Sequence, residues 1–418
     1  MSCIVQYVPD HPFPIQNLPY GVFVKGGDAP HIGVAIGDFI LDLNVLAREQ
    51  GVFPPQVAAA LQEPTMNTFM GLDYDTWKQT RDTITSALTA GGLLAGNEAL
   101  KGAALVRQRD VKMVLPANIG DYTDCYASRE HATNLGKMFR PNAAPLLENW
   151  LHIPVGYHGR SSSIVVSGTP LTRPNGQKRP NPEAPPTFGP SAAVDFELEM
   201  AAYVGTGNEL GEPIPVAEAH KKIFGFSTFN DWSARDIQKW EYVPLGPFLG
   251  KNFGSTISPW IVTTFALEPF RVAGPAQSEP EPLPYLRDST PGNYDINLTV
   301  TINTKEGDSM VVSNSNYKYM YWSVFQQLAH HSVNGCNMRP GDVIASGTIS
   351  GPTEGSYGSM IELAWQGTKP VKFPSGAERK MIQDGDTVVM NAECVGNGYR
   401  IGFGDCSGMV LPAKELKF

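Results

Sequence analysis

The stretch Asp195-Phe-Glu-Leu-Glu-Met-Ala-Ala-Tyr-Val204 alternates acidic and apolar residues over its first six positions. In a β-strand alternate side chains share a face, so Asp195, Glu197 and Glu199 point one way and their apolar neighbours point into a core. Carboxylates spaced about 7 Å apart along one strand repel one another unless positive charge lies among them. The pattern therefore fits either a solvated outer sheet face or a cation site.

Two isolated acids favour the cation site. Asp124 lies in Gly-Asp-Tyr-Thr-Asp-Cys-Tyr, and Asp231 lies in Phe-Asn-Asp-Trp, both aromatic and weakly charged settings. Four oxygen ligands from three segments suit a hard cation such as Ca²⁺ or Mg²⁺. The sequence therefore predicts a metal site.

Composition indicates a globular protein of mainly β structure. At 418 residues the chain is too long for one ordinary core, so we expect two domains. Its 42 glycines and 35 prolines favour turns and short strands over long helices. A net charge of −9 argues against nucleic acid or an anionic membrane as a partner. No apolar run approaches the roughly 18 residues of a membrane span.

Cysteine usage predicts a cytoplasmic protein. The five cysteines are odd in number, widely spaced and without a Cys-x-x-Cys pair. This pattern is typical of free thiols in a reducing compartment. The N-terminus has no basic head or long apolar region, so we expect no secretion signal.

The chain divides into a small domain over 1–117 and a larger one over 118–418. In the small domain we expect glycine-punctuated strands, two helices around 54–62 and 75–90, and a crossing segment over 111–120. In the larger domain one helix is predicted over 321–331, and the proline-rich stretches 170–190 and 264–293 are expected to form ordered surface loops. The predicted strands there are 163–168, 195–204, 294–303, 342–346, 359–365 and 386–395.

The chain has no nucleophile elbow, metalloprotease helix, phosphate loop or dinucleotide fingerprint, so its histidines are the candidates for a catalytic base. His131 lies seven residues after Asp124. A lone histidine is usually structural, but nearness to a metal ligand favours a general base. His152 and His158 are weaker candidates.

Two cationic side chains complete the candidate set. Lys251 lies between Gly250 and Phe253 in an apolar stretch, which favours a partly buried ammonium over a snorkelling surface lysine. Arg235 and Gln238 are three residues apart, so one helical turn would aim both together. A simple ion pair between Asp231 and Arg235 is the alternative.

Seven motifs together resemble the fumarylacetoacetase family of hydrolases. The motifs are Gly-Asp-Tyr-Thr-Asp (120–124), His-Ala-Thr-Asn (131–134), Pro-Val-Gly-Tyr-His-Gly-Arg (154–160), Glu-Leu-Glu-Met (197–200), Asn-Asp-Trp-Ser-Ala-Arg-Asp (230–236), Gly-Pro-Phe-Leu-Gly-Lys (246–251) and Ala-Ser-Gly-Thr-Ile-Ser-Gly (345–351). The resemblance extends into the small domain and covers nearly the whole chain. It implies a mainly β (α+β) protein with an SH3-like N-terminal barrel, a C-terminal mixed β-sandwich roll and a homodimer.

The resemblance also implies a role for each matching residue. It makes His131 the general base with Glu362 as its orienting partner, and Lys251, Arg235 and Gln238 the groups that gather negative charge. The implied metal ligands are Asp124, Glu197, Glu199 and Asp231, with Lys251 and Ser255 near a second cation. The implied substrate contacts are Tyr126, Arg140, Tyr157, Gln238, Tyr242 and Thr348.

The implied reaction is hydrolysis of 4-fumarylacetoacetate to fumarate and acetoacetate, the last step of tyrosine and phenylalanine catabolism, with Ca²⁺ or Mg²⁺ as cofactor. Alternatives are another diketo-acid enzyme of the superfamily, such as an acylpyruvate hydrolase or oxaloacetate decarboxylase, and an inactive metal-stabilised binding protein. Ser255, Cys125 and Glu130 depart from the family pattern. Ser255 replaces a threonine, which weakens the case for a second cation.

Overall fold

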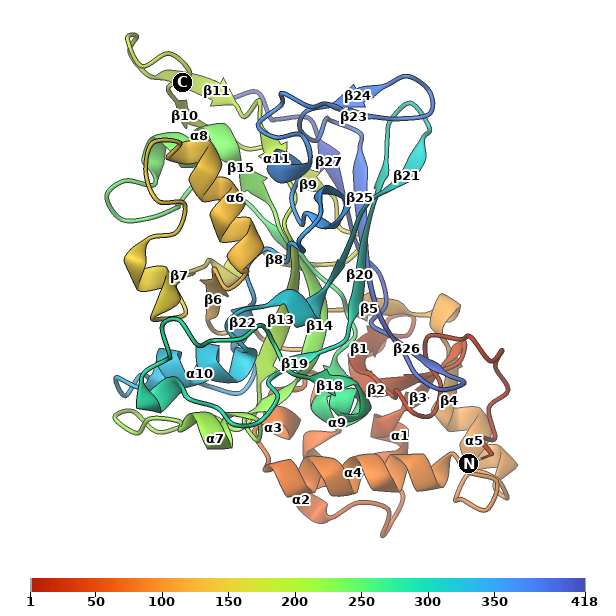
Figure 1. Ribbon diagram of the computed structural model, residues 1–418. Helices are drawn as coiled ribbons and strands as arrows, with labels where there is room; N and C mark the ends of the chain where they lie inside the picture. Colours follow the sequence, from red (N-terminus) through yellow and green to blue (C-terminus); the bar gives the residue numbers. More distant parts are fainter. Residues whose placement is uncertain (1, 418) are drawn as a thin grey trace.

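A computed structural model describes residues 2–417, and its centre is the antiparallel pair β13 (Leu198–Val204) and β14 (Ile223–Asp231) (Figure 1). This pair belongs to an eight-stranded mixed sheet in the order β7-β6-β22-β13-β14-β16-β8, with β17 also paired to β14. The other strands of this sheet are β6 (Tyr122–Cys125), β7 (Gly156–His158), β8 (Ile164–Val166), β16 (Ser255–Ile257), β17 (Val262–Thr263) and β22 (Val343–Ala345). The mainly β prediction is confirmed.

A second, six-stranded sheet packs on one face of the first. Its order is β21-β20-β25-β27-β9, with β26 paired to β25. Its strands are β9 (Leu171–Thr172), β20 (Asn297–Asn303), β21 (Ser309–Asn316), β25 (Thr387–Val395), β26 (Arg400–Gly402) and β27 (Cys406–Leu411). Apolar side chains from both sheets form one core, in which Met200 of β13 and Met390 of β25 are buried.

The small N-terminal part covers the other face of the central sheet (Figure 1). Its antiparallel sheet, in the order β4-β3-β2-β1-β5, consists of β1 (Tyr20–Val24), β2 (His31–Ile36), β3 (Phe39–Asp42), β4 (Leu105–Arg107) and β5 (Lys112–Val114). Its helices are α1 (Leu43–Ala47), α2 (Pro55–Ala60), α3 (Asn67–Met70), α4 (Tyr74–Ala87) and α5 (Glu98–Ala104). The two expected helices correspond to α2 and α4, and β5 occupies part of the expected crossing segment.

Packing between the small part and the sheet is extensive. The Tyr20 ring stacks on Phe69 and meets the edge of Phe224 on β14, with centroids 5.5 Å apart in both pairs. Such aromatic pairs contribute beyond their buried area. The SH3-like description and the domain boundary at 117 stay predictions.

The alternation of β13 decides where polar groups collect. Its even-numbered side chains, such as Leu198 and Met200, enter the core between the two large sheets. Its odd-numbered residues Ala201 and Tyr203 pack against the small N-terminal part. Glu199 lies on this second face, where the apolar cover ends, so the strand delivers carboxylates to a site between layers.

Two strand predictions need correction. Residues 359–365 were expected to form a strand, but they contain the helix α11 (Met360–Leu363), whose Met360 N–H is bound by the Asp195 carboxylate. The expected strand 195–204 is interrupted at 196–197, between β12 (Val194–Asp195) and β13. There the Glu197 N–H donates to the Asn230 side chain instead of a strand partner.

The remaining elements border the central sheets. They are α6 (Arg129–Phe139), α7 (Val216–Ala219), α8 (Arg235–Glu241), α9 (Thr264–Leu267), α10 (Val324–Ser332), β10 (Asn175–Lys178), β11 (Thr187–Pro190), β15 (Ser233–Ala234), β18 (Arg271–Val272), β19 (Asn293–Tyr294), β23 (Val371–Lys372) and β24 (Glu378–Arg379). Both proline-rich stretches contain short elements, the hairpin β10–β11 in 170–190 and the helix α9 in 264–293. Within residues 2–417, no helix has the length and apolar character needed to cross a bilayer.

Candidate active site

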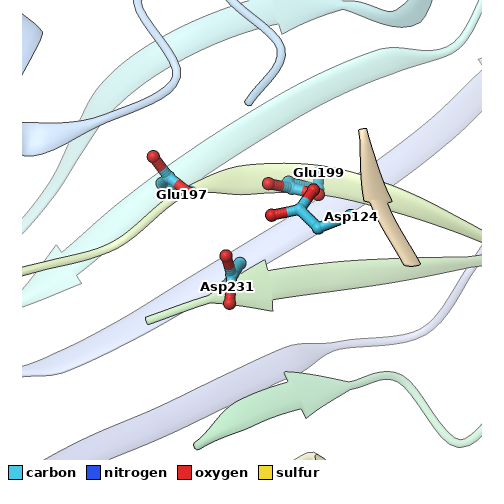
Figure 2. Close-up of side chains that lie close together, drawn as sticks. All are labelled: Asp124, Glu197, Glu199 and Asp231. Carbon is cyan, nitrogen blue, oxygen red and sulfur yellow. The ribbon is translucent and has the colours of Figure 1, made fainter. Parts of the chain in front are cut away.

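Four carboxylates meet where β6, β13 and β14 come together. Asp124 lies on β6, Glu199 on β13, Glu197 just before it and Asp231 at the end of β14 (Figure 2). One oxygen from each residue lies within 4.8 Å of the others. Glu197 is 4% exposed and Glu199 is 0% exposed. The solvated-face interpretation is therefore wrong.

The electrostatics of this cluster favour the binding of a cation. Burial and the neighbouring Asp231 carboxylate raise the pKa of Asp124 well above its usual range. Burial, Asp124 and Asp231 do the same to the pKa of Glu199. Asp124 Oδ1 and Glu199 Oε1 are buried and accept no hydrogen bond from the described residues. Hard divalent cations prefer such oxygen-only donor sets, so the residues present fit Ca²⁺ or Mg²⁺.

Lys251 neutralises one side of the cluster. Its ammonium is buried and contacts Glu197 Oε2 and, at 2.5 Å, Asp231 Oδ2. Burial alone would lower the pKa of Lys251, but Asp231 and Glu197 outweigh it and the net pKa is raised. The side chain is therefore charged at neutral pH. An ammonium has donors but no lone pair, so its nitrogen cannot ligate a cation in this state. The proposed place of Lys251 near a second cation stays a prediction.

Arg235 is the second buried cation, at the start of α8. Its Nε donates to Asp195 Oδ2 and its Nη2 to Glu197 Oε1, both at 2.7 Å. Its Nη1 lies 3.3 Å from Gln238 Oε1, so the helical turn does bring these two residues together. The simple Asp231–Arg235 ion pair considered from the spacing is not formed, because Arg235 pairs with Asp195 and Glu197 instead.

Tyr157 and Ser255 bind the same aspartate from two sides. The Tyr157 hydroxyl donates to Asp231 Oδ2 at 3.1 Å, and the Ser255 hydroxyl donates to Asp231 Oδ1 at 3.2 Å. Both side chains therefore orient Asp231. Whether Ser255 also serves a second cation stays a prediction.

His131 meets Glu362 beside the carboxylate cluster. The Nδ1 atom of His131 lies 2.7 Å from Glu362 Oε2, and Nε2 lies 3.7 Å from Glu197 Oε1. Both side chains are buried. Because the carboxylate binds the Nδ1 proton, the Nε2 lone pair is left to accept a proton. This is the geometry that a general base needs.

The helix α6 places His131 in this position. The Ser128 hydroxyl caps the helix by accepting the His131 N–H at 3.2 Å. Glu130 lies in the first helical turn, where burial raises its pKa.

Sequence reasoning missed the groups that hold Glu362. Asn134 donates to its Oε1 at 2.9 Å, while the hydroxyls of Ser350 and Ser359 donate to its Oε2 at 2.9 and 2.7 Å. Burial raises the pKa of Glu362, but His131 and these donors outweigh it and lower the net pKa. Asn134 is three residues after His131, so a helical interpretation of this segment would have found it.

The proposed substrate contacts lie in different settings. The Tyr126 ring meets the His131 ring edge-on at 5.5 Å, and Thr348 is buried next to Gly347, whose N–H binds Glu199. Arg140 is half-buried at the end of α6 and donates to the Pro145 carbonyl. Tyr242 is 49% exposed at the end of α8. The structure thus brings Tyr126 close to His131, while Tyr242 lies at the surface.

The weaker histidine candidates and Cys125 lie away from the position of the proposed base. His152 and His158 are exposed, and the ring of His158 meets the ring of His331 edge-on, with centroids 6.2 Å apart. Cys125 follows Asp124 on β6 and is buried, and burial raises the pKa of its thiol well above its usual range. All five cysteines are free, as the sequence predicts.

Family models match both parts of the chain. The model described as fumarylacetoacetase N-terminal matches residues 16–116, and the model described as fumarylacetoacetate (FAA) hydrolase C-terminal matches residues 122–410. Fumarylacetoacetases of Bos taurus and Homo sapiens are each 55% identical to the chain. The alignments cover 98% of this chain and 99% of the bovine protein, and 97% of this chain and 97% of the human protein.

A solved structure supports the fold. The fumarylacetoacetate hydrolase of the psychrophile Exiguobacterium antarcticum superposes with a TM-score of 0.53 at 18% identity. The superposition covers 95% of this chain and all of that chain. At this identity the likeness concerns the fold alone.

Proposed function

The chain belongs to the fumarylacetoacetase family, and on that premise we propose that it hydrolyses a carbon–carbon bond of 4-fumarylacetoacetate to give fumarate and acetoacetate. The observation that carries the proposal is the buried His131–Glu362 pair, whose free ring nitrogen faces a cage of four carboxylates. In an organism that degrades tyrosine and phenylalanine, this reaction would be the last step.

His131 starts the reaction by taking a proton from water. With Nδ1 held by Glu362, its Nε2 accepts the proton while the water oxygen bonds to the carbonyl carbon. The carbonyl π electrons move to its oxygen, which becomes an oxyanion. When that oxyanion collapses, the carbon–carbon bond breaks, fumarate forms, and the departing carbon fragment takes up a proton to become acetoacetate.

We propose that Lys251, Arg235 and Gln238 bind the oxyanion. Lys251 and Arg235 are buried, and pairing with carboxylates fixes both before any substrate arrives. Donors fixed in advance stabilise charge that develops in the transition state, and losing one commonly costs ~3 kcal/mol of barrier. Their carboxylate partners hold them in place.

A divalent cation would be held by the four-carboxylate cluster, for which we propose Ca²⁺ or Mg²⁺. When bound, it supplies the positive charge that makes an enolate an acceptable leaving group. The two buried carboxylate oxygens without a hydrogen bond support this assignment. The tyrosines Tyr126, Tyr157 and Tyr242, together with Arg140 and Thr348, are proposed to contact the diacid.

Turnover of fumarylacetoacetate tests the function directly. We expect its absorbance to fall on adding the protein, to stop falling after chelation, and to resume with Ca²⁺ or Mg²⁺. An acylpyruvate run in parallel separates the family's other diketo-acid activities from this one. No turnover of either compound by metal-loaded protein would contradict the proposal and favour an inactive binding protein.

We also propose a cytoplasmic homodimer. Family membership supports this, and the segment after α8 exposes apolar side chains that a second copy could bury, including Val243 at 67%, Leu245 at 95% and Phe248 at 66%. Light scattering should give twice the 45.4 kDa chain mass. A monomeric mass at micromolar concentration would contradict the dimer.

A further inference from the structure

Asp195 is a fully buried carboxylate that adjoins the cation cluster in sequence but is not one of its four members. It accepts three hydrogen bonds. Oδ1 accepts the Met360 N–H at 2.7 Å, and Oδ2 accepts the Ile361 N–H at 3.2 Å and Arg235 Nε–H at 2.7 Å. A buried carboxylate is costly unless such donors compensate it, so these three contacts define its position.

The three partners of Asp195 belong to two different halves of the active site. Arg235 reaches on to Glu197 and Gln238, on the side that binds negative charge. Met360 and Ile361 begin α11, the one-turn helix that carries Glu362 to His131. A single carboxylate therefore contacts both the oxyanion side and the base side.

Taking the proposed function as its basis, we propose that Asp195 is a positioning residue that fixes Arg235 and α11 relative to each other. The base and the oxyanion donors must meet one substrate in one geometry, yet they come from segments far apart in sequence. Asp195, at the end of β12, joins them directly, and close by, at the start of β13, the Leu198 N–H also donates to the Gly358 carbonyl at 2.8 Å. Asp195 itself touches no reacting atom.

The short helix α11 depends on Asp195 for its position, so losing this contact can displace catalytic groups. The helix α11 spans four residues, so its own hydrogen bonds hold it weakly, and the Asp195 carboxylate binds its first N–H groups. If that anchor is lost, Glu362 and the His131 ring can shift. Misplacement of catalytic groups by about 1 Å can cost 10²-fold in rate.

Asp195→Asn is the test, because the amide has the same shape but must turn an NH₂ group toward one of the donors. We expect kcat to fall about 10- to 100-fold, with KM and bound metal little changed. The downfield proton NMR signal of His131 Nδ1–H should weaken or move. If Asp195→Asn does not fold, Asp195→Glu keeps the charge and tests the geometry alone, with the same expected loss of kcat.

Asp386→Asn is the matched control. Asp386 is also fully buried and binds an arginine and backbone N–H groups, through Arg379 Nε at 2.7 Å and Gln383 N at 2.9 Å, but it contacts no residue of the site. The Asp386→Asn substitution should lower the melting temperature without lowering kcat. If Asp195→Asn behaves in the same way, or releases the metal, the positioning role is wrong. Since the NMR signal needs no turnover, inactivity of the wild type toward fumarylacetoacetate would instead refute the proposed function.

Discussion

The contact between His131 and Glu362 is the residue-level feature with the largest chemical consequence. It fixes the tautomer of a buried imidazole and leaves one ring nitrogen directed at the carboxylate cluster. Three further donors saturate Glu362, so the carboxylate has one orientation. The pair should therefore act as one unit.

We expect His131→Ala to remove most turnover while the fold and bound metal persist. Combining it with Glu362→Ala should cost little more than the histidine change alone, because residues that act together are not additive. Single-turnover rates of the two single variants and the double variant measure the coupling. A structural histidine would give the opposite pattern: normal activity per folded molecule and a lowered melting temperature.

Lys251→Met should lower kcat about 10²- to 10³-fold with a small effect on KM, because the ammonium meets charge that exists mainly in the transition state. The change also leaves Glu197 and Asp231 without their buried partner, which costs stability. Rates are therefore compared per folded, metal-loaded molecule. A variant altered only in KM would identify Lys251 as a substrate clamp.

At the scale of elements, α6 and α11 carry the two members of this pair. Ser128 connects the two helices. Its hydroxyl caps α6 by accepting the His131 N–H, and it donates to the Ser350 carbonyl at 3.3 Å. The Ser350 side chain in turn binds Glu362. A helix cap here has a catalytic consequence as well as a structural one.

We expect Ser128→Ala to cost about 1 kcal/mol of stability, as cap losses typically do, and in addition to lower kcat. Ser323→Ala is the control, since its hydroxyl caps α10 in the same way by accepting the Gln326 N–H at 3.3 Å. Melting curves and initial rates of both variants decide the matter. Equal kcat in the two variants would mean that the Ser128 cap only stabilises.

The sequence predicted those elements that are specified by the alternation of their own residues. The alternation of 386–395 gives β25, and the acidic and apolar faces of 198–200 give the start of β13. The segment 359–365 could not be assigned in this way, because its helix begins where Asp195, 165 residues away, binds Met360 N–H. For the same reason, the sequence alone could not distinguish the role of Asp195 from the roles of Glu197 and Glu199. All three share a spacing, and Arg235 binds both Asp195 and Glu197, so only the distant N–H groups of Met360 and Ile361 distinguish the anchor Asp195 from the cluster members.

At the scale of the whole molecule, the carboxylate cluster couples folding to metal and pH. Three layers of the fold meet around the cluster, so repulsion among its buried carboxylates affects the stability of the whole protein. Asp124 and Glu199 have raised pKa values in the folded protein. The metal-free folded state therefore binds more protons than the unfolded state above the ordinary carboxyl pKa of about 4.

This sign predicts that metal-free protein loses stability as the pH rises from about 4 through the raised pKa values, by about 1.4 kcal/mol per pH unit for each such group. Protons compete with the cation for the same oxygens, so the metal effect should grow over the same range. Melting temperatures with chelator and with Ca²⁺ or Mg²⁺ should diverge from pH 5 to pH 8. A constant difference would show that these carboxyls are not the metal ligands.

Glu199→Gln should change stability in opposite directions with and without metal. The amide has the same shape but no charge, so in chelator it relieves repulsion with Asp124 and Asp231 and raises the melting temperature at pH 8. With metal it removes a charged ligand and weakens binding at least about tenfold, which is about 1.4 kcal/mol. Glu63→Gln, on the exposed surface of the small N-terminal part, should change neither value. Metal analysis that finds full occupancy and unchanged affinity in Glu199→Gln would remove Glu199 from the ligand set. A fall in melting temperature without metal would mean that its buried charge stabilises the fold by contacts other than the cation.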